Sequence, residues 1–372
     1  MRAELVDPSA FTPPYDRALA AALARAGVEV ELLTSRFLYG PVPDADGYRV
    51  RELFYRRSAG RGLDAPGRRA FKLAEHLPGM ARLRRATAAA DVVHYQWLTL
   101  PALDSRILPR ARPRVMTAHY VLPPNPSRRQ LAGARGAFGA MDAVIAHSEH
   151  GARRLREEIG LDPGRVHVIP HGAFGYLTEL AAEKPLPAEL ADAEGPVILF
   201  FGLLRPYKGI EVLLEAFRRV EGVELWVVGN PRMDVAPLRA LAAAAEGRVR
   251  FLTRFVEDSE IPAIMRRSDL LVLPYLDAEH SGVLYTGLAF GKPMILSAVG
   301  GFPEVAATGA ATTVPPGDPG ALAAELRRLI GDEDARADLS RAALAAAAGP
   351  YSWDAVAGRT LDLYEELLEA RR

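Results

Sequence analysis

The chain has 372 residues, of which 49% are hydrophobic and 25% are charged, a composition typical of a globular protein. Basic and acidic residues both number 46, so the net charge gives no reason to expect nucleic acid as a partner. The chain has no cysteine, which excludes disulfides, cysteine-ligated zinc and a thiol nucleophile. Its length exceeds that of one ordinary core and predicts two domains.

The apolar runs of the sequence bear on the cellular location of the protein. No run is long enough to span a bilayer, and the first residues, MRAELVDPSAF, lack the apolar region of a signal peptide. We therefore expect a cytoplasmic protein. Basic residues crowd the segment 51–85, where only Glu52, Asp64 and Glu75 oppose them. They are Arg51, Arg56, Arg57, Arg61, Arg68, Arg69, Lys72, Arg82, Arg84 and Arg85. The first interpretation is a solvated face. The alternatives are peripheral contact with anionic lipid at the inner face of the membrane and contact with an acidic acceptor.

The first half of the chain alternates short apolar runs with helical segments. Strands are predicted at 4–6, 28–33, 48–54, 92–95, 114–118, 143–146 and 166–169. Helices are predicted at 15–25, 68–90 and 149–159. Strands that alternate with helices at this spacing indicate a parallel, doubly wound α/β sheet.

The same alternation restarts after a weakly periodic linker at 172–195. Strands are predicted at 196–201, 224–228, 249–252, 270–273, 294–297 and 312–314, and helices at 210–217, 237–245, 284–290 and 319–330. A final amphipathic helix follows, with Ser352 as its N-cap. We expect a first domain over 1–180, a second over 181–351, and a C-terminal helix, 352–372, that packs back on the first.

One loop of the second half carries two cations between glycines. It reads FFGLLRPYKG and lies between a predicted strand and a predicted helix. Gly202 and Gly209 allow a tight turn and a close approach to a ligand. Arg205 and Lys208 suit the oxygens of a diphosphate, although a plain basic surface loop would look the same.

Two further loops are expected at the same edge of the second sheet. After the strand 270–273 comes PYLDAEHSG, in which Asp277, Glu279 and His280 precede Ser281 and Gly282 at a helix N-terminus. A Ser-Gly pair at a helix start offers free backbone N–H groups to an anion. The third loop, VGGFPE, follows the next strand. Because carboxyl ends of parallel strands share one edge, the three loops are predicted to line one crevice.

As a set, these segments resemble the GT-B glycosyltransferases of the large retaining GT4 family. In the second half the motifs are HVIPHG, FFGLLRPYKG, WVVGN, DLLVLPY, SGVLYTGLAFGKPMI and GGFPEV. In the first half DVVHYQW, TAHYVLPP and AVIAHSEHGARRL match more loosely. The resemblance implies two Rossmann-like domains that face each other across a cleft, with the nucleotide-sugar donor on the second and the acceptor on the first.

The resemblance also implies roles for individual residues. Arg205 and Lys208 would hold the leaving diphosphate, and Gly202 and Gly209 would let the backbone approach it. Ser281, Gly282 and Val283 would offer backbone amides, Phe255 and Val256 would border the base, and His119 would face the donor sugar. The other residues assigned to the donor site are Asp277, Glu279, His280 and Thr286, and those assigned to the acceptor side are Pro14, Tyr15 and Tyr120.

The chain departs from the family at two glutamates that are usually separated by seven residues. Thr286 stands in the place of the second, which holds the ribose in the family, and its hydroxyl could partly replace that carboxylate. The place of the first falls near Ala278, between Asp277 and Glu279. Glu279 is the predicted sugar-facing carboxylate, with Asp277 as the alternative.

The resemblance therefore predicts transfer of a sugar from a nucleoside-diphosphate donor to an acceptor hydroxyl, with retention of configuration. The acceptor class stays open among a glycan, a lipid-linked glycan and a small molecule. The resemblance also implies that no metal or other cofactor is required. The two D-x-D runs, Asp44–Asp46 and Asp332–Asp334, are explained as turns. Two alternatives remain: a nucleotide-sugar epimerase on the same fold, and a degenerate binding subunit, which the change at Thr286 motivates.

Overall fold

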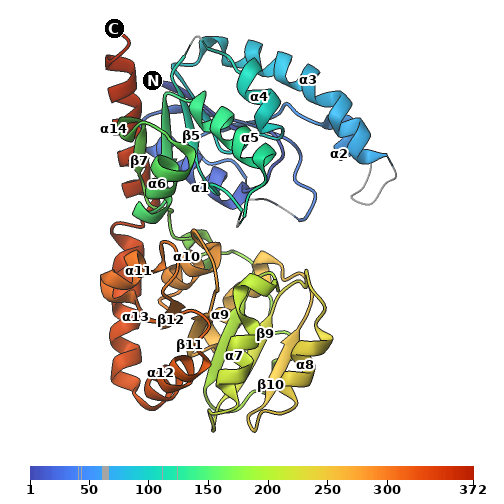
Figure 1. Cartoon of the computed structure of the whole chain (residues 1–372), viewed down its shortest axis with the longest axis vertical. Helices are drawn as coiled ribbons and strands as arrows, with labels where there is room; N and C mark the ends of the chain where they lie inside the picture. The colour runs from blue at the N-terminus through green and yellow to red at the C-terminus, as the bar shows by residue number, and fades with distance from the viewer. Residues whose placement is uncertain (41, 43, 61–66, 111, 124) are drawn as a thin grey trace. The chain divides into compact units, whose positions relative to one another are not determined.

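The computed structural model describes residues 1–40, 42, 44–60, 67–110, 112–123 and 125–372. The chain divides into two compact units (Figure 1). The first comprises Met1–Gly172 and Trp353–Arg372, and the second comprises Ala173–Ser352. The chain leaves the first unit at Gly172, whereas the sequence placed the boundary after residue 180.

The first unit contains a seven-stranded parallel sheet with the strand order β3-β2-β1-β4-β5-β6-β7. The strands are β1 (Arg2–Asp7), β2 (Glu29–Thr34), β3 (Arg49–Glu52), β4 (Val92–Tyr95), β5 (Arg114–Thr117), β6 (Ala143–Ala146) and β7 (Val166–Val168). All seven overlap the predicted runs, and β1 extends beyond its run at both ends. The central strands β1 and β4 are neighbours, with Val6 opposite Tyr95. Their buried residues show that both faces of the sheet are covered.

Helices connect the strands of the first unit. They are α1 (Pro13–Arg25), α2 (Arg56–Ala59), α3 (Arg68–Ala86), α4 (Pro101–Ile107), α5 (Arg128–Gly139) and α6 (Glu149–Arg154). The predicted helix 68–90 ends as α helix at Ala86 and tightens into a 3₁₀ turn over Thr87–Ala89. The predicted helix 149–159 continues from α6 as a π turn over Leu155–Ile159.

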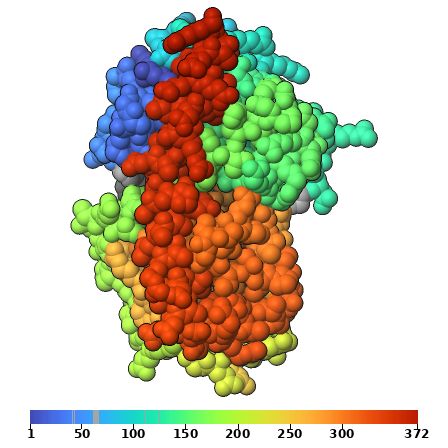
Figure 2. Space-filling model, turned by 90° about the vertical axis from the view of Figure 1, so that its left-hand side faces the viewer, coloured from blue at the N-terminus to red at the C-terminus, as the bar shows by residue number. Residues whose placement is uncertain are grey.

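The last helix, α14 (Trp353–Glu369), packs on the first unit, as the sequence predicted (Figure 1). The hydroxyl of Tyr364 lies 2.6 Å from Nδ1 of the buried His94 on β4. Arg25 of α1 donates to Asp354 of α14 at 2.6 Å. In the space-filling view the helix runs across the surface of this unit as the red segment (Figure 2).

The second unit contains a six-stranded parallel sheet with the strand order β10-β9-β8-β11-β12-β13. The strands are β8 (Val197–Phe201), β9 (Glu224–Val228), β10 (Val249–Leu252), β11 (Leu270–Leu273), β12 (Met294–Ser297) and β13 (Ala311–Val314). The helices are α7 (Ile210–Phe217), α8 (Ala236–Ala242), α9 (Ile261–Arg267), α10 (Gly282–Ala289), α11 (Phe302–Val305), α12 (Pro319–Gly331) and α13 (Glu333–Ala348). Every predicted strand of this half is present. The prediction of two Rossmann-like α/β domains is therefore confirmed.

The predicted elements omitted helix α13. The run Asp332–Asp334 was interpreted as a turn, but Asp332 is the N-cap of α13, and its side chain accepts from the backbone N–H of Ala335 at 2.9 Å. Glu333 already begins the helix, where its negative charge favours the N-terminus.

No helix in the described part of the chain is both long enough and apolar enough to cross a membrane. Three residues of the sequence-based predictions, Arg61 and Asp64 in the basic segment and Pro124 in the TAHYVLPP motif, lie outside the described residues.

Candidate active site

The second sheet reverses its winding between β8 and β11. The chain moves from β8 to one side, through β9 to β10, and from β11 to the other, through β12 to β13. At such a switch point the loops after the two central strands diverge and leave a crevice for ligands. The loop after β8 is FFGLLRPYKG and the loop after β11 begins PYLDAEHSG, so both predicted motifs flank the switch point.

Backbone contacts join the three predicted loops of the second unit. The N–H of Leu276 donates to the carbonyl of Tyr207 at 2.7 Å, which links the loops after β11 and β8. The N–H of Gly301 donates to the carbonyl of Glu279 at 3.0 Å, which links the loops after β12 and β11. Gly209 has φ +66°, and a Cβ there would lie 1.9 Å from the carbonyl oxygen of Pro274. The loops therefore converge as predicted, and Gly209 is required for the approach.

Lys208 is a buried cation, only 7% exposed, at the centre of this edge. Its Nζ donates to the hydroxyl of Tyr275 at 2.8 Å, and that hydroxyl lies 3.1 Å from Oγ of Ser281. The pKa of Lys208 is lowered from 10.5 to about 8, chiefly by burial; Tyr207 opposes the shift and the nearby Arg205 adds to it. Within the described residues no carboxylate pairs with this ammonium, which is costly for a buried charge.

Gly202 and Arg205 complete the loop after β8. A Cβ at Gly202 would meet Nζ of Lys208 and a methyl group of Val283, each at 3.0 Å, so this glycine leaves space between the cation and α10. Arg205 is exposed, and its guanidinium forms no ion pair with the described residues. The loop thus presents one buried and one exposed cation, as a diphosphate site would need.

Helix α10 begins beside Lys208. Ser281 is its N-cap, but the Ser281 hydroxyl contacts Tyr275 instead of capping the helix. The first N–H groups of a helix have no partner within the helix, so those of Gly282 and Val283 remain available to a ligand. The hydroxyl of Thr286 donates to the carbonyl of Gly282 at 3.0 Å, which leaves its oxygen as an acceptor only.

The acidic residues of the loop after β11 differ in exposure. Asp277 is exposed, Glu279 is only 8% exposed, and His280 is intermediate. Glu279 is held through its backbone by Gly301. Because Glu279 is buried and its backbone is held, its carboxylate is better suited than that of the exposed Asp277 to contact the donor sugar in a fixed geometry.

The loop after β10 carries the two residues assigned to the nucleotide base. Phe255 is 49% exposed and Val256 is buried. The loop is braced by Arg254, whose guanidinium forms a forked pair with Glu260 at 2.6 and 2.9 Å. An exposed aromatic ring on a braced loop is a suitable stacking surface.

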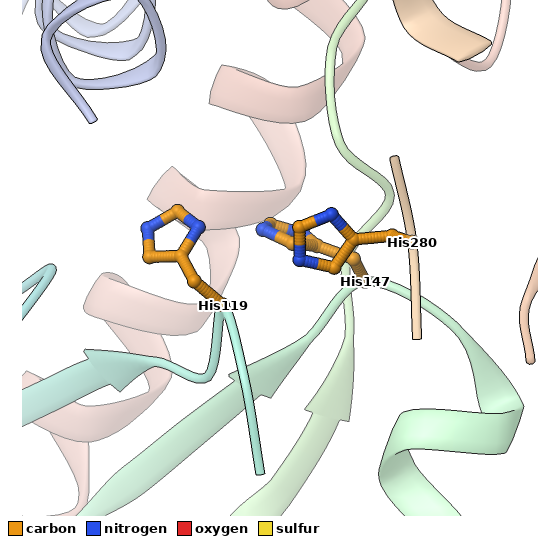
Figure 3. Close-up of side chains that lie close together, drawn as sticks. All are labelled: His119, His147 and His280. Atoms are coloured by element: carbon orange, nitrogen blue, oxygen red, sulfur yellow. The ribbon is translucent and has the colours of Figure 1, made fainter. Parts of the chain in front are cut away.

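In the first unit, aromatic and histidine side chains gather at the carboxyl edge of the sheet. His119 follows β5 and His147 follows β6, with ring centroids 5.4 Å apart (Figure 3). His119 stacks on Trp97 at 5.2 Å, and its Nε2 lies 3.0 Å from Oε1 of Gln96. The Nδ1–H of His147 donates to the carbonyl of Ile169 at 3.0 Å, which fixes the orientation of its ring.

The three residues assigned to the acceptor side have different surroundings. Tyr15 is only 3% exposed, and its ring packs within 5.2 Å of His119, His147, His171 and Trp353. Burial raises its pKa. Tyr15 therefore packs against the histidine rings inside the first unit. Tyr120 is 47% exposed, and Pro14 lies in the first turn of α1.

Sequence reasoning missed a buried carboxyl pair at the end of β1. Asp7 accepts the N–H groups of Ser9, Phe11 and Thr12 at 3.1, 2.6 and 3.2 Å. Asp16, on α1, is 1% exposed and accepts from the Thr12 hydroxyl at 3.2 Å. Burial raises the pKa of both carboxyls, and that of Asp16 is raised further by Asp7. Tyr275 was also missed. Asp7, His147 and Tyr275 come at or just after a strand end, which is the signal that could have identified them.

Comparisons with known proteins agree with this geometry. Residues 17–173 match the family described as Glycosyltransferase Family 4, and residues 195–332 match the family described as Glycosyl transferases group 1. The chain is 27% identical to the D-inositol 3-phosphate glycosyltransferase of Kineococcus radiotolerans, over 95% of this chain and 89% of the relative.

Solved structures share the fold over the whole chain. The sucrose-phosphate synthase of Thermosynechococcus elongatus superposes with a TM-score of 0.75 at 20% identity and covers 100% of both chains. The Anabaena protein Alr3699/HepE in complex with UDP-glucose superposes with a TM-score of 0.71 at 21% identity, over 99% of this chain and 100% of the other. The chain is thus a glycosyltransferase of the GT-B fold and belongs to the GT4 family.

Proposed function

We propose that this glycosyltransferase moves a sugar from a nucleoside-diphosphate donor to an acceptor hydroxyl and retains the anomeric configuration. The donor binds at the β8/β11 switch point of the second unit. The neighbour Alr3699/HepE was solved with UDP-glucose, which supports a donor of this class.

The observation that carries the proposal is the buried ammonium of Lys208. It has three N–H donors, and within the described part of the chain its hydrogen-bond acceptor is the Tyr275 oxygen. A diphosphate would supply both the missing negative charge and the missing acceptors. Gly202 leaves space beside Nζ, and the start of α10 adds backbone N–H groups.

The mechanism assigns electrostatic work to these groups. As the glycosidic bond breaks, negative charge grows on the leaving diphosphate, where Lys208 and Arg205 stabilise it. In a retaining transfer of this kind the leaving phosphate oxygen takes the proton of the acceptor hydroxyl on the same face of the sugar. We propose that no metal is required, so turnover should persist in the presence of a chelator.

Lys208→Ala tests the role of the buried cation. The loss of one preorganised donor predicts a fall in turnover of about 100-fold or more. Lys184→Ala is the matched control, because Lys184 is exposed and pairs with Glu257 at 2.7 Å. Near-normal turnover of Lys208→Ala would remove this residue from the mechanism.

Two other functions make different predictions in the same assays. An epimerase would convert the nucleotide-sugar without an acceptor, whereas a transferase would release sugar slowly or not at all. A degenerate binding subunit, suggested by Thr286, would bind nucleoside diphosphates without turnover, or would bind none of them. Calorimetric titration with nucleoside diphosphates, followed by incubation with donor alone, separates the three.

We further propose a cytoplasmic location with peripheral contact to anionic lipid through α3. The helix exposes Leu73 and Leu77, one turn apart on the same face, by 61 and 56%. Basic residues lie on or beside this apolar face, namely Arg69, Arg84 and Arg85. Apolar side chains with flanking cations match an anionic bilayer surface. Leu73→Glu combined with Leu77→Glu should abolish sedimentation with phosphatidylglycerol vesicles, and equal binding of this variant would contradict the proposal.

A further inference from the structure

A chain of hydrogen bonds runs through the carboxyl edge of the first unit. The Asp104 carboxylate lies 2.5 Å from Nε2 of His76, and Nδ1 of His76 lies 2.7 Å from the hydroxyl of Tyr55. The Tyr55 hydroxyl donates to Oγ1 of Thr99 at 3.0 Å. Oγ of Ser9 lies 3.0 Å from that oxygen and accepts from Nζ of Lys72 at 2.9 Å.

The outer end of this network lies at the switch point of the first sheet. Ser9 follows β1 and Thr99 follows β4, and these neighbouring strands send their connections in opposite directions. The crevice at the carboxyl ends of two such strands is where open α/β sheets bind ligands. Phe11, 56% exposed, stands at the same place and meets Trp97 edge-on at 5.3 Å.

The positive charge of Lys72 is poorly balanced at this position, because the acceptor of its ammonium is a neutral hydroxyl. Its ammonium lies 4.7 Å from the ring centroid of Tyr55 and 5.7 Å from that of Phe11. Its acceptor within the described residues is the Ser9 hydroxyl, which leaves two N–H donors. Burial lowers the pKa of Lys72, and the like charge of Arg68 lowers it further, while Asp7 partly opposes the shift.

Arg68 adds a second cation to the same place. Arg68 and Lys72 are one turn apart on α3, a spacing at which like charges repel. The Nε of Arg68 is buried and has no hydrogen-bond partner among the described atoms. Asp7, the nearby carboxylate, is occupied by the backbone N–H groups of Ser9, Phe11 and Thr12. The site therefore has more donors than acceptors and more positive charge than negative.

The inner end of the network is rigid. His76 and Asp104 are 1 and 0% exposed, and the second oxygen of Asp104 accepts from the N–H of Leu100 at the start of α4. Tyr55 has φ +50°, a left-handed conformation that is strained for a non-glycine residue. A strained backbone conformation persists where the surrounding structure holds the residue in place, and such residues are common at functional sites. Here it directs the Tyr55 hydroxyl toward Thr99 and the ring toward Lys72.

We propose that Lys72, Arg68, Ser9 and Thr99 form a subsite for an anionic group, a phosphate or a carboxylate, carried by the acceptor. The Asp104–His76–Tyr55 relay is the positioning element of this subsite. The inference rests on the proposed function in one respect, namely that the acceptor binds to the first unit. It narrows the acceptor class to hydroxyl compounds that carry a negative charge.

Competitive acetylation of the full-length protein tests the subsite residue by residue. The chain has four lysines, Lys72, Lys184, Lys208 and Lys292, and each can be followed by mass spectrometry. Inorganic phosphate and acetate, added at constant ionic strength with a nucleoside diphosphate present, are the probes. We expect a saturable slowing of acetylation at Lys72 and no change at the exposed Lys184. The stronger of the two probes identifies the anionic group.

Single substitutions distinguish a positioning role of Tyr55 from a general loss of structure. Tyr55→Phe keeps the ring beneath Lys72 but removes the hydroxyl, and it should weaken phosphate protection about three- to tenfold, as expected for one hydrogen bond. Ser9→Ala should act similarly. The matched control, Arg106→Met, removes an exposed cation of the neighbouring helix α4 and should leave protection unchanged.

The outcomes distinguish this inference from the donor assignment. Protection of Lys208 by nucleoside diphosphate alone reports on the proposed function, and protection of Lys72 by phosphate reports on the subsite. If phosphate and acetate leave the acetylation of Lys72 unchanged while Lys208 is protected, the subsite is wrong and the donor site stands. If phosphate protects Lys72 in Tyr55→Phe as well as it does in the wild type, the relay has no positioning role.

Discussion

Nζ of Lys208 donates a 2.8 Å hydrogen bond to the hydroxyl of Tyr275, across the two loops that flank the β8/β11 switch point. Lys208 lies 67 positions before Tyr275, and neither is exposed by more than 7%. The contact fixes the position of the ammonium, but the Tyr275 hydroxyl is neutral and does not balance its positive charge. The predictions for the donor site follow from this state.

The first prediction concerns the pH dependence of catalysis. Burial lowers the pKa of Lys208 to about 8, so the free enzyme loses this charge as the pH rises through that value. The kcat/KM for the donor should therefore fall above about pH 8. Tyr275→Phe removes the acceptor of the ammonium and should move this fall to lower pH. A profile that stays flat to about pH 10, a value near the ordinary pKa of lysine, would contradict the assignment.

The second prediction concerns the stability of the unliganded protein. The folded pKa of Lys208 is below its unfolded value, so burial of the charged form opposes folding at neutral pH, and stability rises with pH between the two values. Lys208→Met removes the charge and keeps an unbranched side chain that is only one atom shorter. It should raise the melting temperature at about pH 7 while turnover is lost. A lower melting temperature would show that the ammonium stabilises the fold.

The third prediction separates two glycines with positive φ. Gly27 has φ +88° and open space where a Cβ would lie, whereas a Cβ at Gly209 would overlap the Pro274 carbonyl at 1.9 Å. Gly27→Ala should cost roughly 1 kcal/mol of backbone strain. Gly209→Ala should cost more and should also weaken donor binding, because the loop after β11 must move. Equal melting temperatures for the two variants would exclude the close approach.

The fourth prediction concerns Glu4 on β1, whose side chain is fully buried. Burial, with a further contribution from Glu31, raises its pKa from 4.5 to about 7, although Arg2 donates to it at 2.9 Å. The folded pKa is above the unfolded value, so the stabilisation is present below pH 4.5 and is lost as the pH rises through about 7. One such group contributes a slope of at most about 1.4 kcal/mol per pH unit.

Glu4→Gln should remove this pH dependence. The amide oxygen can still accept from Arg2, and the other oxygen of Glu4 has no partner among the described atoms. Urea unfolding between about pH 5 and 8 should show a declining stability for the wild type and a flatter one for the variant. Glu29→Gln is the control, since pairing with Arg49 lowers the pKa of Glu29 and keeps its titration below this window.

The sequence alone determined the alternation of strands and helices and the family. It also determined which loops meet at the carboxyl edge of the second sheet, because apolar periodicity and glycine spacing are local properties of the chain. Arg205 and Lys208 could be recognised from the loop in which they stand. Helix α13 was missed because its alanines give little apolar periodicity.

Only the tertiary structure decided which side chains are buried and which are paired. Tyr15, predicted at the acceptor side, lies beneath the histidines, and the hydroxyl of Thr286 is bound to its own helix. The network from Asp104 to Lys72 joins segments that follow β1, β3 and β4 and two helices. Such contacts, and the pKa values that depend on them, arise from the order in which parallel strands assemble, which no local pattern encodes.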